Sequence, residues 1–274
     1  MDVKIIGFYC ICADFLKSLK YQDDPQCGMS AAEVMTAALT AAAFFSGSHE
    51  KACRFLKEYG YIPDMLSKSR FSRRLAAVPE SVWRGLAEQL ARSAYAPDSL
   101  NIFIIDSFPV PVCRNIRIKR CRIYQDERFR GYSASFRQYF YGLKVHVLMT
   151  ETGIPAEIIM SHGSCSDISA FHEFSLQLPP ESVIIGDKAY NDYMFKDSLK
   201  ENGVHLMPLR RKNSKRKYDP LVESGIKFIR KRIESAFSVI KQRFPAHIQA
   251  VTHQGFELKA FLFVLAYGLE KIML

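Results

Sequence analysis

The spacing of hydrophobic and polar positions divides the chain into two parts. Residues 1–95 show the spacing of helices, and Ser30-Ala-Ala-Glu33 has the form of a capping box ahead of an alanine-rich helix. The turn-rich segment 96–99 then interrupts this pattern. We therefore predict a helical N-terminal domain over residues 1–95 and a second domain over residues 96–274.

After this boundary the pattern changes to short apolar runs and alternating positions, which are typical of strands. The predicted strands cover 101–106, 141–149, 154–160, 182–187 and 204–207. A turn at 151–153 joins the second and third of them in a hairpin. Helical spacing returns over 221–244 and from about 256 onward. This order predicts an α/β domain in which helices cover a mixed sheet.

Two of the predicted strands end in an aspartate, Asp106 and Asp187. Both carboxylates are expected at the C-terminal edge of a buried sheet, where ligand sites gather in open α/β sheets. The plainer alternative is that each aspartate starts a turn or caps the next helix. The occurrence of two such strands favours a functional site.

The long predicted helix supplies a third acid, Glu234. At about 100° per residue, an apolar stripe runs from Ile226 to Phe244, and Arg230, Glu234 and Lys241 fall at its flank. We expect Glu234 at the border of the core between two cations. The alternative is an ordinary Arg–Glu surface pair four residues apart. Other acids (Asp126, Asp167 and Glu223) are expected outside this group, with Asp167 available to cap a helix.

Three facing carboxylates would repel one another unless cations lay among them. Hard oxygen ligands suit Mg²⁺ or Mn²⁺. Two such ions can activate a water or a 3′-hydroxyl and stabilise the departing oxygen of a phosphodiester. The sequence contains no phosphate-binding loop, nucleophile elbow or zinc-protease motif that would favour another chemistry.

The net charge of +10 indicates an acidic partner, either nucleic acid or an anionic membrane. Residues 208–243 carry a net charge of +9 and residues 112–130 a net charge of +5, so the rest of the chain is net acidic. Seven aromatic residues are interleaved with the cations of segment 113–141. Aromatics can stack on bases while cations hold phosphates, which favours nucleic acid. A solvated basic loop is the alternative.

Neither of the most apolar stretches, 31–45 and 260–269, reaches the roughly 20 residues that span a bilayer. The first residues do not resemble a secretory signal, so we expect a cytoplasmic protein with reduced cysteines. Cys10-x-Cys12 lacks a second pair at ligand spacing, which disfavours a zinc site.

Three motifs resemble those of bacterial insertion-sequence transposases of the DDE type: Ile-Ile-Asp106-Ser, Ile-Gly-Asp187-Lys-Ala-Tyr190, and Arg230-x3-Glu234-x6-Lys241. The segment 66–74 and the strand 141–146 make the insertion-sequence-982 family the most similar. The resemblance extends from about residue 30 to residue 250.

The resemblance implies an RNase H-like catalytic domain and a helical N-terminal domain that helps to bind the terminal inverted repeats of an element. Asp106, Asp187 and Glu234 would hold two Mg²⁺ or Mn²⁺ ions. The implied activity is DNA cleavage at the element's ends and joining of the 3′-hydroxyl to target DNA. The implied protein is a homo-oligomer on DNA, associated with the bacterial nucleoid.

Cations near these motifs and in the two basic segments are expected to contact DNA phosphates. They are Arg230, Lys241, Lys144, Lys188, Arg210, Arg211, Lys212, Lys215, Arg216, Lys217, Arg114, Arg117, Lys119 and Arg120. Two rival interpretations share most of these features: a host nuclease of the same fold that cuts without joining, and a non-catalytic DNA-binding descendant. The presence of all three acids argues against the second rival.

Overall fold

The computed structural model describes the chain except residues 96–100, 114, 134–136, 246 and 274. It forms two compact units. The first unit contains residues 1–90, 240–250 and 254–274, and the second contains 91–239 and 251–253. The predicted second domain covers all of residues 96–274. The last helix instead groups with the N-terminal helices.

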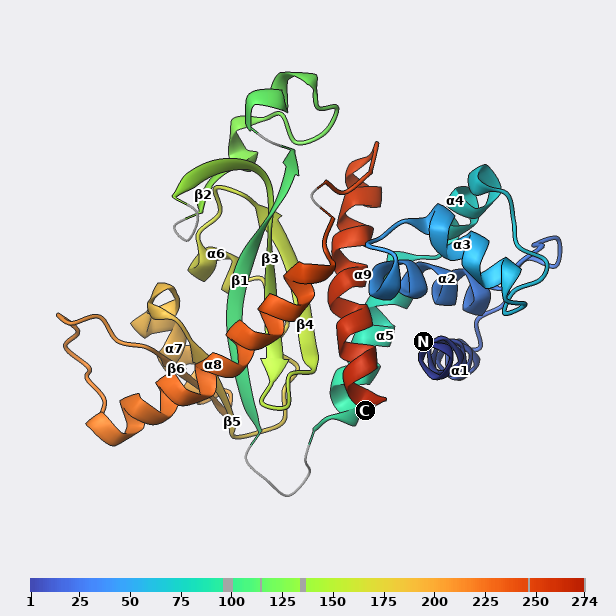
Figure 1. Cartoon of the computed structure of the whole chain (residues 1–274). Helices are drawn as coiled ribbons and strands as arrows, with labels where there is room; N and C mark the ends of the chain where they lie inside the picture. Colours follow the sequence, from blue (N-terminus) through green and yellow to red (C-terminus); the bar gives the residue numbers. More distant parts are fainter. Residues whose placement is uncertain (96–100, 114, 134–136, 246, 274) are drawn as a thin grey trace. The chain divides into compact units, whose positions relative to one another are not determined.

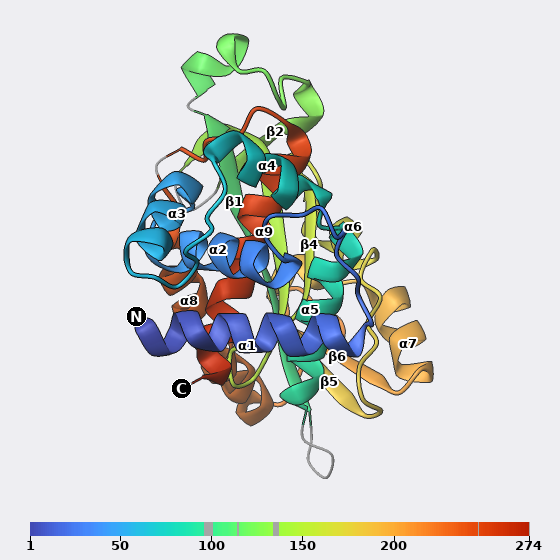
Figure 2. The same cartoon turned by 90° about the vertical axis from the view of Figure 1, so that its right-hand side faces the viewer.

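The first unit is helical, as predicted. Its helices are α1 (Asp2–Ser18), α2 (Ala31–Phe44), α3 (His49–Glu58), α4 (Lys68–Ala77), α5 (Glu80–Ser93) and α9 (His253–Ile272). The predicted capping box is confirmed, because the Ser30 side chain accepts from the Glu33 N–H and the Glu33 carboxylate accepts from the Ser30 N–H. Helix α1 packs against α2 (Figure 2).

Both α2 and α9 are buried around most of their circumference, which explains why their sequences are apolar on all sides. No described helix is long and apolar enough to cross a membrane.

The described residues of the second unit form a six-stranded mixed sheet (Figure 1). The strands are β1 (Ile102–Cys113), β2 (Arg130–Ser133), β3 (Gln138–Thr150), β4 (Pro155–His162), β5 (Ser182–Gly186) and β6 (Val204–Pro208). Their order is β2-β3-β1-β5-β6, and β4 also pairs with β3. The predicted hairpin is confirmed as the antiparallel β3–β4 pair, whereas β1, β5 and β6 run parallel.

Strand β1 is longer than predicted, and Asp106 lies within it rather than at its end. Pro109 and Pro111 fall in the extension beyond the predicted strand 101–106. Strand β5 has already ended there, so this part of β1 pairs with β3 alone. An edge strand tolerates proline because the missing N–H costs no bond on the open side.

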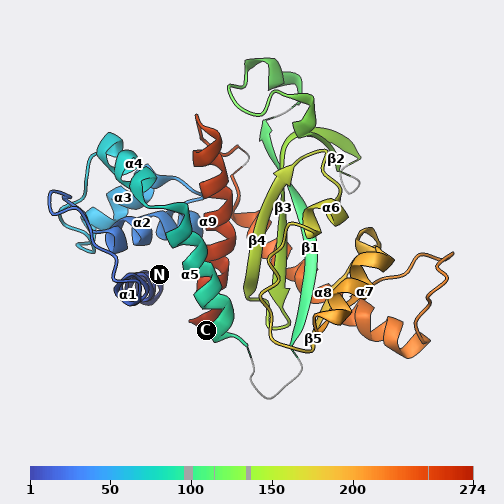
Figure 3. The same ribbon diagram turned by 180° about the vertical axis from the view of Figure 1, so that it is seen from behind.

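Helices cover both faces of the sheet (Figures 1 and 3). On one face lies α8 (Pro220–Arg243), whose Ile226 packs against Ile185 of β5 and Leu209. On the other lie α6 (Asp167–Phe171) and α7 (Tyr193–Glu201), whose Phe171 and Leu199 pack with residues of β1 and β5. Three 3-10 turns complete the unit: η1 (Asn115–Arg120), η2 (Glu127–Phe129) and η3 (Lys188–Tyr190).

Candidate active site

The strand register places Asp106 level with Asp187. In the parallel β1–β5 pair, Ile104 is opposite Ile185, and each aspartate follows two residues later in its own chain segment. Residues two apart on a strand share a face, so Asp106 lies on the face of Ile104, toward α8. Asp187 follows directly after the last residue of β5. The two strands are neighbours as predicted, but only Asp187 follows the end of its strand, whereas Asp106 lies within β1.

The surroundings of Asp106 disfavour the ionised form of its carboxyl group. Burial raises its pKa from 3.8 to about 6, and the negative charges of Asp187 and Asp167 add to this effect. The Ser107 N–H, which donates to Asp106 Oδ1 at 2.8 Å, and the guanidinium of Arg230 oppose it. A cation bound at this carboxylate would lower its pKa again, because positive charge favours the ionised form.

Arg230 of α8 links Asp106 to Glu234. Its Nη2 atom lies 3.5 Å from Asp106 Oδ2 and 4.0 Å from Glu234 Oε1. The two carboxylate oxygens are thus at most 7.5 Å apart, the sum of these two distances. The Glu234 side chain is 61% exposed, so the expectation that it lies at the border of the core was wrong. Arg230 is the residue at that border, with 13% exposure.

Tyr190 is a buried residue close to three aspartates. Its ring is buried, and burial followed by the charges of Asp167, Asp106 and Asp187 raises the pKa of its hydroxyl well above the usual value. Tyr190 therefore lies within the electrostatic range of all three aspartates.

The side chains of the acid group are carboxylates, the type of ligand that hard cations such as Mg²⁺ and Mn²⁺ prefer. Among the described residues, no three His, Cys, Asp or Glu side chains are arranged as they stand to hold a metal ion. The donors are nevertheless carboxylates, and the Arg230 guanidinium already supplies positive charge between Asp106 and Glu234. A span of up to 7.5 Å is compatible with two ions about 3.5–4 Å apart, each about 2 Å from its oxygens.

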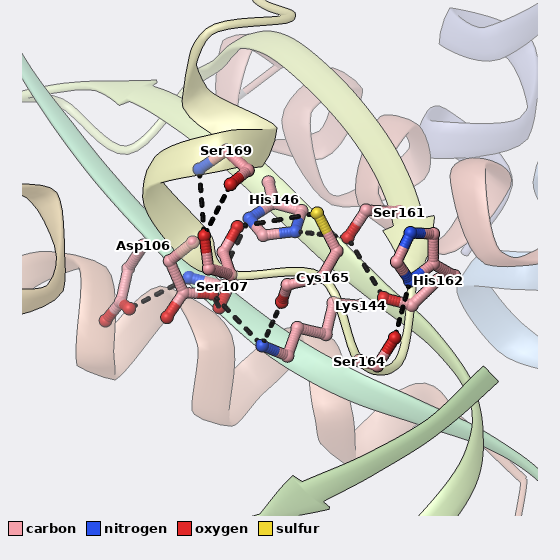
Figure 4. A network of polar contacts seen from close by, with 11 residues as sticks. Asp106, Ser107, Lys144, His146, Ser161, His162, Ser164, Cys165 and Ser169 are labelled. Atoms are coloured by element: carbon pink, nitrogen blue, oxygen red, sulfur yellow. Dashed lines mark hydrogen bonds and ion pairs between the residues drawn. The ribbon is translucent and has the colours of Figure 1, made fainter. Parts of the chain in front are cut away.

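The opposite face of the sheet carries a second polar cluster (Figure 4). The Ser107 hydroxyl donates to Asp167 Oδ1 at 2.8 Å, and Lys144 Nζ lies 3.5 Å from the same oxygen. His146 is fully buried, with Nδ1 4.0 Å from Asp167 and Nε2 2.8 Å from Ser161 Oγ. Burial lowers the pKa of His146 to about 4, so its ring is neutral at neutral pH.

Asp167 therefore belongs to this second cluster, on the face of β1 opposite the Asp106 carboxylate. It does not cap its helix, because Ser166 is the N-cap of α6 and accepts from the Ser169 N–H. Sequence analysis missed the link between Ser107 and Asp167. The available signal was weak: a hydroxyl directly after the first acid, and an acid 60 residues further on at a helix start. By contrast, Glu223 pairs with Lys227 and Asp126 caps η2.

A family model described as a transposase DDE domain matches residues 97–254, more than half of the chain. The chain belongs to this transposase DDE domain family. No curated protein sequence matches it. A solved structure with a similar fold is the cryo-EM structure of piggyBac transposase in a synaptic complex with hairpin DNA, at 10% identity and a TM-score of 0.51. The match covers 98% of this chain and 71% of that chain, and it supports the predicted mixed sheet flanked by helices.

Most of the cations expected to contact DNA lie on the surface of this DDE protein. The exposed residues are Lys188, Arg211, Lys212, Lys215, Arg216, Lys217, Arg117, Lys119, Arg120 and Lys241. Arg114 lies outside the described residues. Lys144 differs from the exposed set because its ammonium group donates to the Cys165 carbonyl at 2.7 Å and faces Asp167.

Arg210 is a correction to the expected surface row. It is only 7% exposed, and its guanidinium lies over the rings of Tyr193 and Tyr218. Its Nη1 donates to Asn191 Oδ1 at 2.6 Å, and the Asn191 amide donates to the Lys188 and Leu209 carbonyls. Arg210 thus holds the loop that follows Asp187 against the end of β6.

Proposed function

We propose that this chain is an active transposase that cleaves DNA at the ends of its element and joins the freed 3′-hydroxyl to target DNA. The observation that carries the proposal is the position of Asp106, level with Asp187 and at most 7.5 Å from Glu234 across Arg230. The DDE family membership supports phosphodiester chemistry at these acids.

In this proposal Asp106, Asp187 and Glu234 hold two Mg²⁺ or Mn²⁺ ions, whose chemistry is to activate the attacking oxygen and stabilise the departing one. The carboxylates of Asp106 and Asp187 come from adjacent strands, so the sheet fixes their spacing. Arg230 balances the charge of the acids and lies beside any phosphate drawn to them. The exposed cations of segments 115–120 and 211–217 hold the DNA backbone.

We further propose that the protein is bacterial, of the insertion-sequence-982 type, and that it assembles as a homo-oligomer on the terminal inverted repeats and target DNA. The motifs around the acids support the family. The synaptic complex formed by piggyBac transposase with hairpin DNA supports a DNA-bound assembly. The helical unit has the N-terminal position expected of the part that binds the element's ends.

The test uses three matched variants, Asp106→Asn, Asp187→Asn and Glu234→Gln. Each replaces a carboxylate by an amide of nearly the same shape. Cleavage and joining should fall by at least about 10³-fold, while affinity for duplex DNA without metal remains near that of the wild type. Retained cleavage in two of the three variants would overturn the assignment.

A strand-transfer assay separates the transposase from the host nuclease. The substrate is a duplex that ends in the DNA flanking the gene, with a supercoiled plasmid as target. A transposase inserts the 3′-end into the plasmid, whereas a nuclease gives only cut products. Absence of joined product under conditions of efficient cutting would favour the nuclease.

A further inference from the structure

The residue that follows Asp106 links the two faces of the sheet. Ser107 donates its backbone N–H to Asp106 Oδ1 and its hydroxyl to Asp167 Oδ1, both at 2.8 Å. Successive residues of a strand point to opposite faces, so the two acceptors lie on opposite sides of β1. The orientation of Asp106 is therefore connected through one residue to an acid on the α6 face.

Asp167 is itself held by groups from two further elements. Lys144 of β3 approaches its Oδ1 to 3.5 Å and also donates to the carbonyl of Cys165, just before α6. The neighbouring Ser166 closes the first turn of α6 by accepting from the Ser169 N–H. Strand register keeps this set together, because Ser107 is opposite His146 and Lys144 is one step further along the same face. The position of Asp167 is thus fixed by β1, β3 and α6.

We propose that Asp167 is a positioning residue for the acid group, acting through Ser107 on Asp106. The proposal rests on the proposed function, since it concerns the same acids. The Asp167 carboxylate holds the Ser107 hydroxyl by a hydrogen bond. This bond restrains the β1 backbone at Ser107, next to Asp106. The Ser107 N–H then holds one oxygen of Asp106 and leaves the other, Oδ2, directed to Arg230.

Such outer contacts orient the carboxylates that bind metals, and their loss commonly costs 10- to 100-fold in metal affinity or activity. Lys144 has a supporting role in this arrangement. It neutralises Asp167, so that the positioning acid adds less repulsion to Asp106 than an unpaired carboxylate would. This role also explains why Lys144, expected to contact DNA, is directed at an acid and a carbonyl instead.

The experiment measures Mn²⁺ binding to the full chain by electron paramagnetic resonance of the free ion, without DNA. Cleavage of a plasmid carrying the gene's flanking DNA is measured in parallel. Ser107→Ala and Asp167→Ala should each weaken Mn²⁺ affinity by about 10-fold. Ser107→Thr, which keeps the hydroxyl, should retain wild-type affinity. Asp167→Asn keeps an acceptor oxygen for Ser107, so its loss should be smaller than that of Asp167→Ala.

The double variant of Ser107→Ala and Asp167→Ala tests whether the two residues affect Mn²⁺ binding through the same interaction. If Asp167 acts through Ser107, the double variant binds Mn²⁺ no more weakly than the worse single variant. Losses that multiply would overturn the proposal, as would wild-type Mn²⁺ affinity in Ser107→Ala. If Asp167→Ala does not fold, Asp167→Asn and the two Ser107 variants still give the answer. Asp14→Asn makes the same chemical change at an exposed acid of α1 and should leave Mn²⁺ binding unchanged.

Asp106→Asn separates failure of this inference from failure of the proposed function. If Asp106→Asn binds Mn²⁺ and cleaves DNA like the wild type, the acid group is not the active site and both proposals fall. If Asp106→Asn loses Mn²⁺ binding while the Ser107 and Asp167 variants keep it, only the positioning role is overturned.

Discussion

The two faces of the sheet at Asp106 and Ser107 differ in the surroundings that they give to a carboxylate. On the α8 face, Asp106 lies close to Asp187 and shares Arg230 with Glu234, and its pKa is raised to about 6 by burial and by its neighbours. On the α6 face, Asp167 accepts the Ser107 hydroxyl and faces the ammonium of Lys144. The charge of the Asp106 carboxylate is thus disfavoured by its surroundings, whereas the Asp167 carboxylate is hydrogen-bonded and paired with a lysine.

The presence of an acid is therefore a weaker sign of function than the charges and hydrogen-bond donors that surround it. Perturbed pKa values cluster at functional sites because catalysis needs groups held in unfavourable states. An acid whose hydrogen-bond and charge partners are present, such as Asp167, can instead make its surroundings more rigid. In the proposed function the α8 face carries the chemistry and the α6 face supports it, and each of the following predictions tests that division.

The largest effect is expected from removing metal. Dialysis against a chelator should lower cleavage by at least about 10³-fold, because the carboxylates of the α8 face have no other means of activating the attacking oxygen. Mg²⁺ or Mn²⁺ should restore the rate. Zn²⁺ should not, because the group offers oxygen ligands without thiolate or imidazole. Full activity after chelation would place the chemistry elsewhere and remove the distinction between the two faces.

The next effect concerns the cations. Four exposed residues lead into α8: Arg211, Lys212, Lys215 and Lys217. Replacing them by alanine should weaken DNA binding and flatten the log–log dependence of affinity on salt, by about 0.9 for each phosphate that the protein no longer neutralises. Lys144→Ala, on the α6 face, should leave the salt slope unchanged because Lys144 is already paired with Asp167. The opposite result would place the DNA path on the α6 face. Affinity at several salt concentrations, measured by fluorescence anisotropy, decides between them.

The sequence was sufficient for the parts of the site whose signals are local. Apolar runs that end in Asp106 and Asp187 predicted two strands, and helical periodicity predicted the buried stripe of α8, with Ile226, Ile233 and Phe237 in the core. The extension of β1 through Pro109 was missed, because proline reads as the end of a strand unless the edge position is known.

Other features depend on residues that are distant in sequence. Arg210 lies in a basic run and reads as a surface cation, yet Tyr193 and Tyr218 enclose it in the fold. The Ser107–Asp167 bond joins residues 60 positions apart. The exposure of Glu234 was missed because periodicity gives the direction of a side chain relative to the helix, but not how far the neighbouring strand covers it.

The smallest effect is expected in the pH dependence of stability. The folded state raises the pKa of Asp106 from 3.8 to about 6, so between these values it binds more protons than the unfolded state and loses stability as pH rises. On the α6 face, the pKa of His146 is lowered from 6.5 to about 4. The unfolded state then binds more protons, so stability is lost as pH falls from about 6.5 to about 4. The two faces therefore oppose each other over nearly the same pH range.

Asp106→Asn and His146→Gln should reveal these opposing slopes in metal-free protein. Relative to the wild type, Asp106→Asn should gain stability as pH rises from about 4 to above 6, by up to roughly 3 kcal/mol, because two pKa units correspond to about that amount. His146→Gln should gain relative stability as pH falls through the same range, on top of any constant loss from altered packing. Urea unfolding followed by circular dichroism at several pH values measures both differences, with Asp14→Asn as the control. If Asp106→Asn shows no pH-dependent gain in stability over the wild type, the pKa of Asp106 is not raised in the folded state. The proposed difference between the α8 face and the α6 face would then be wrong.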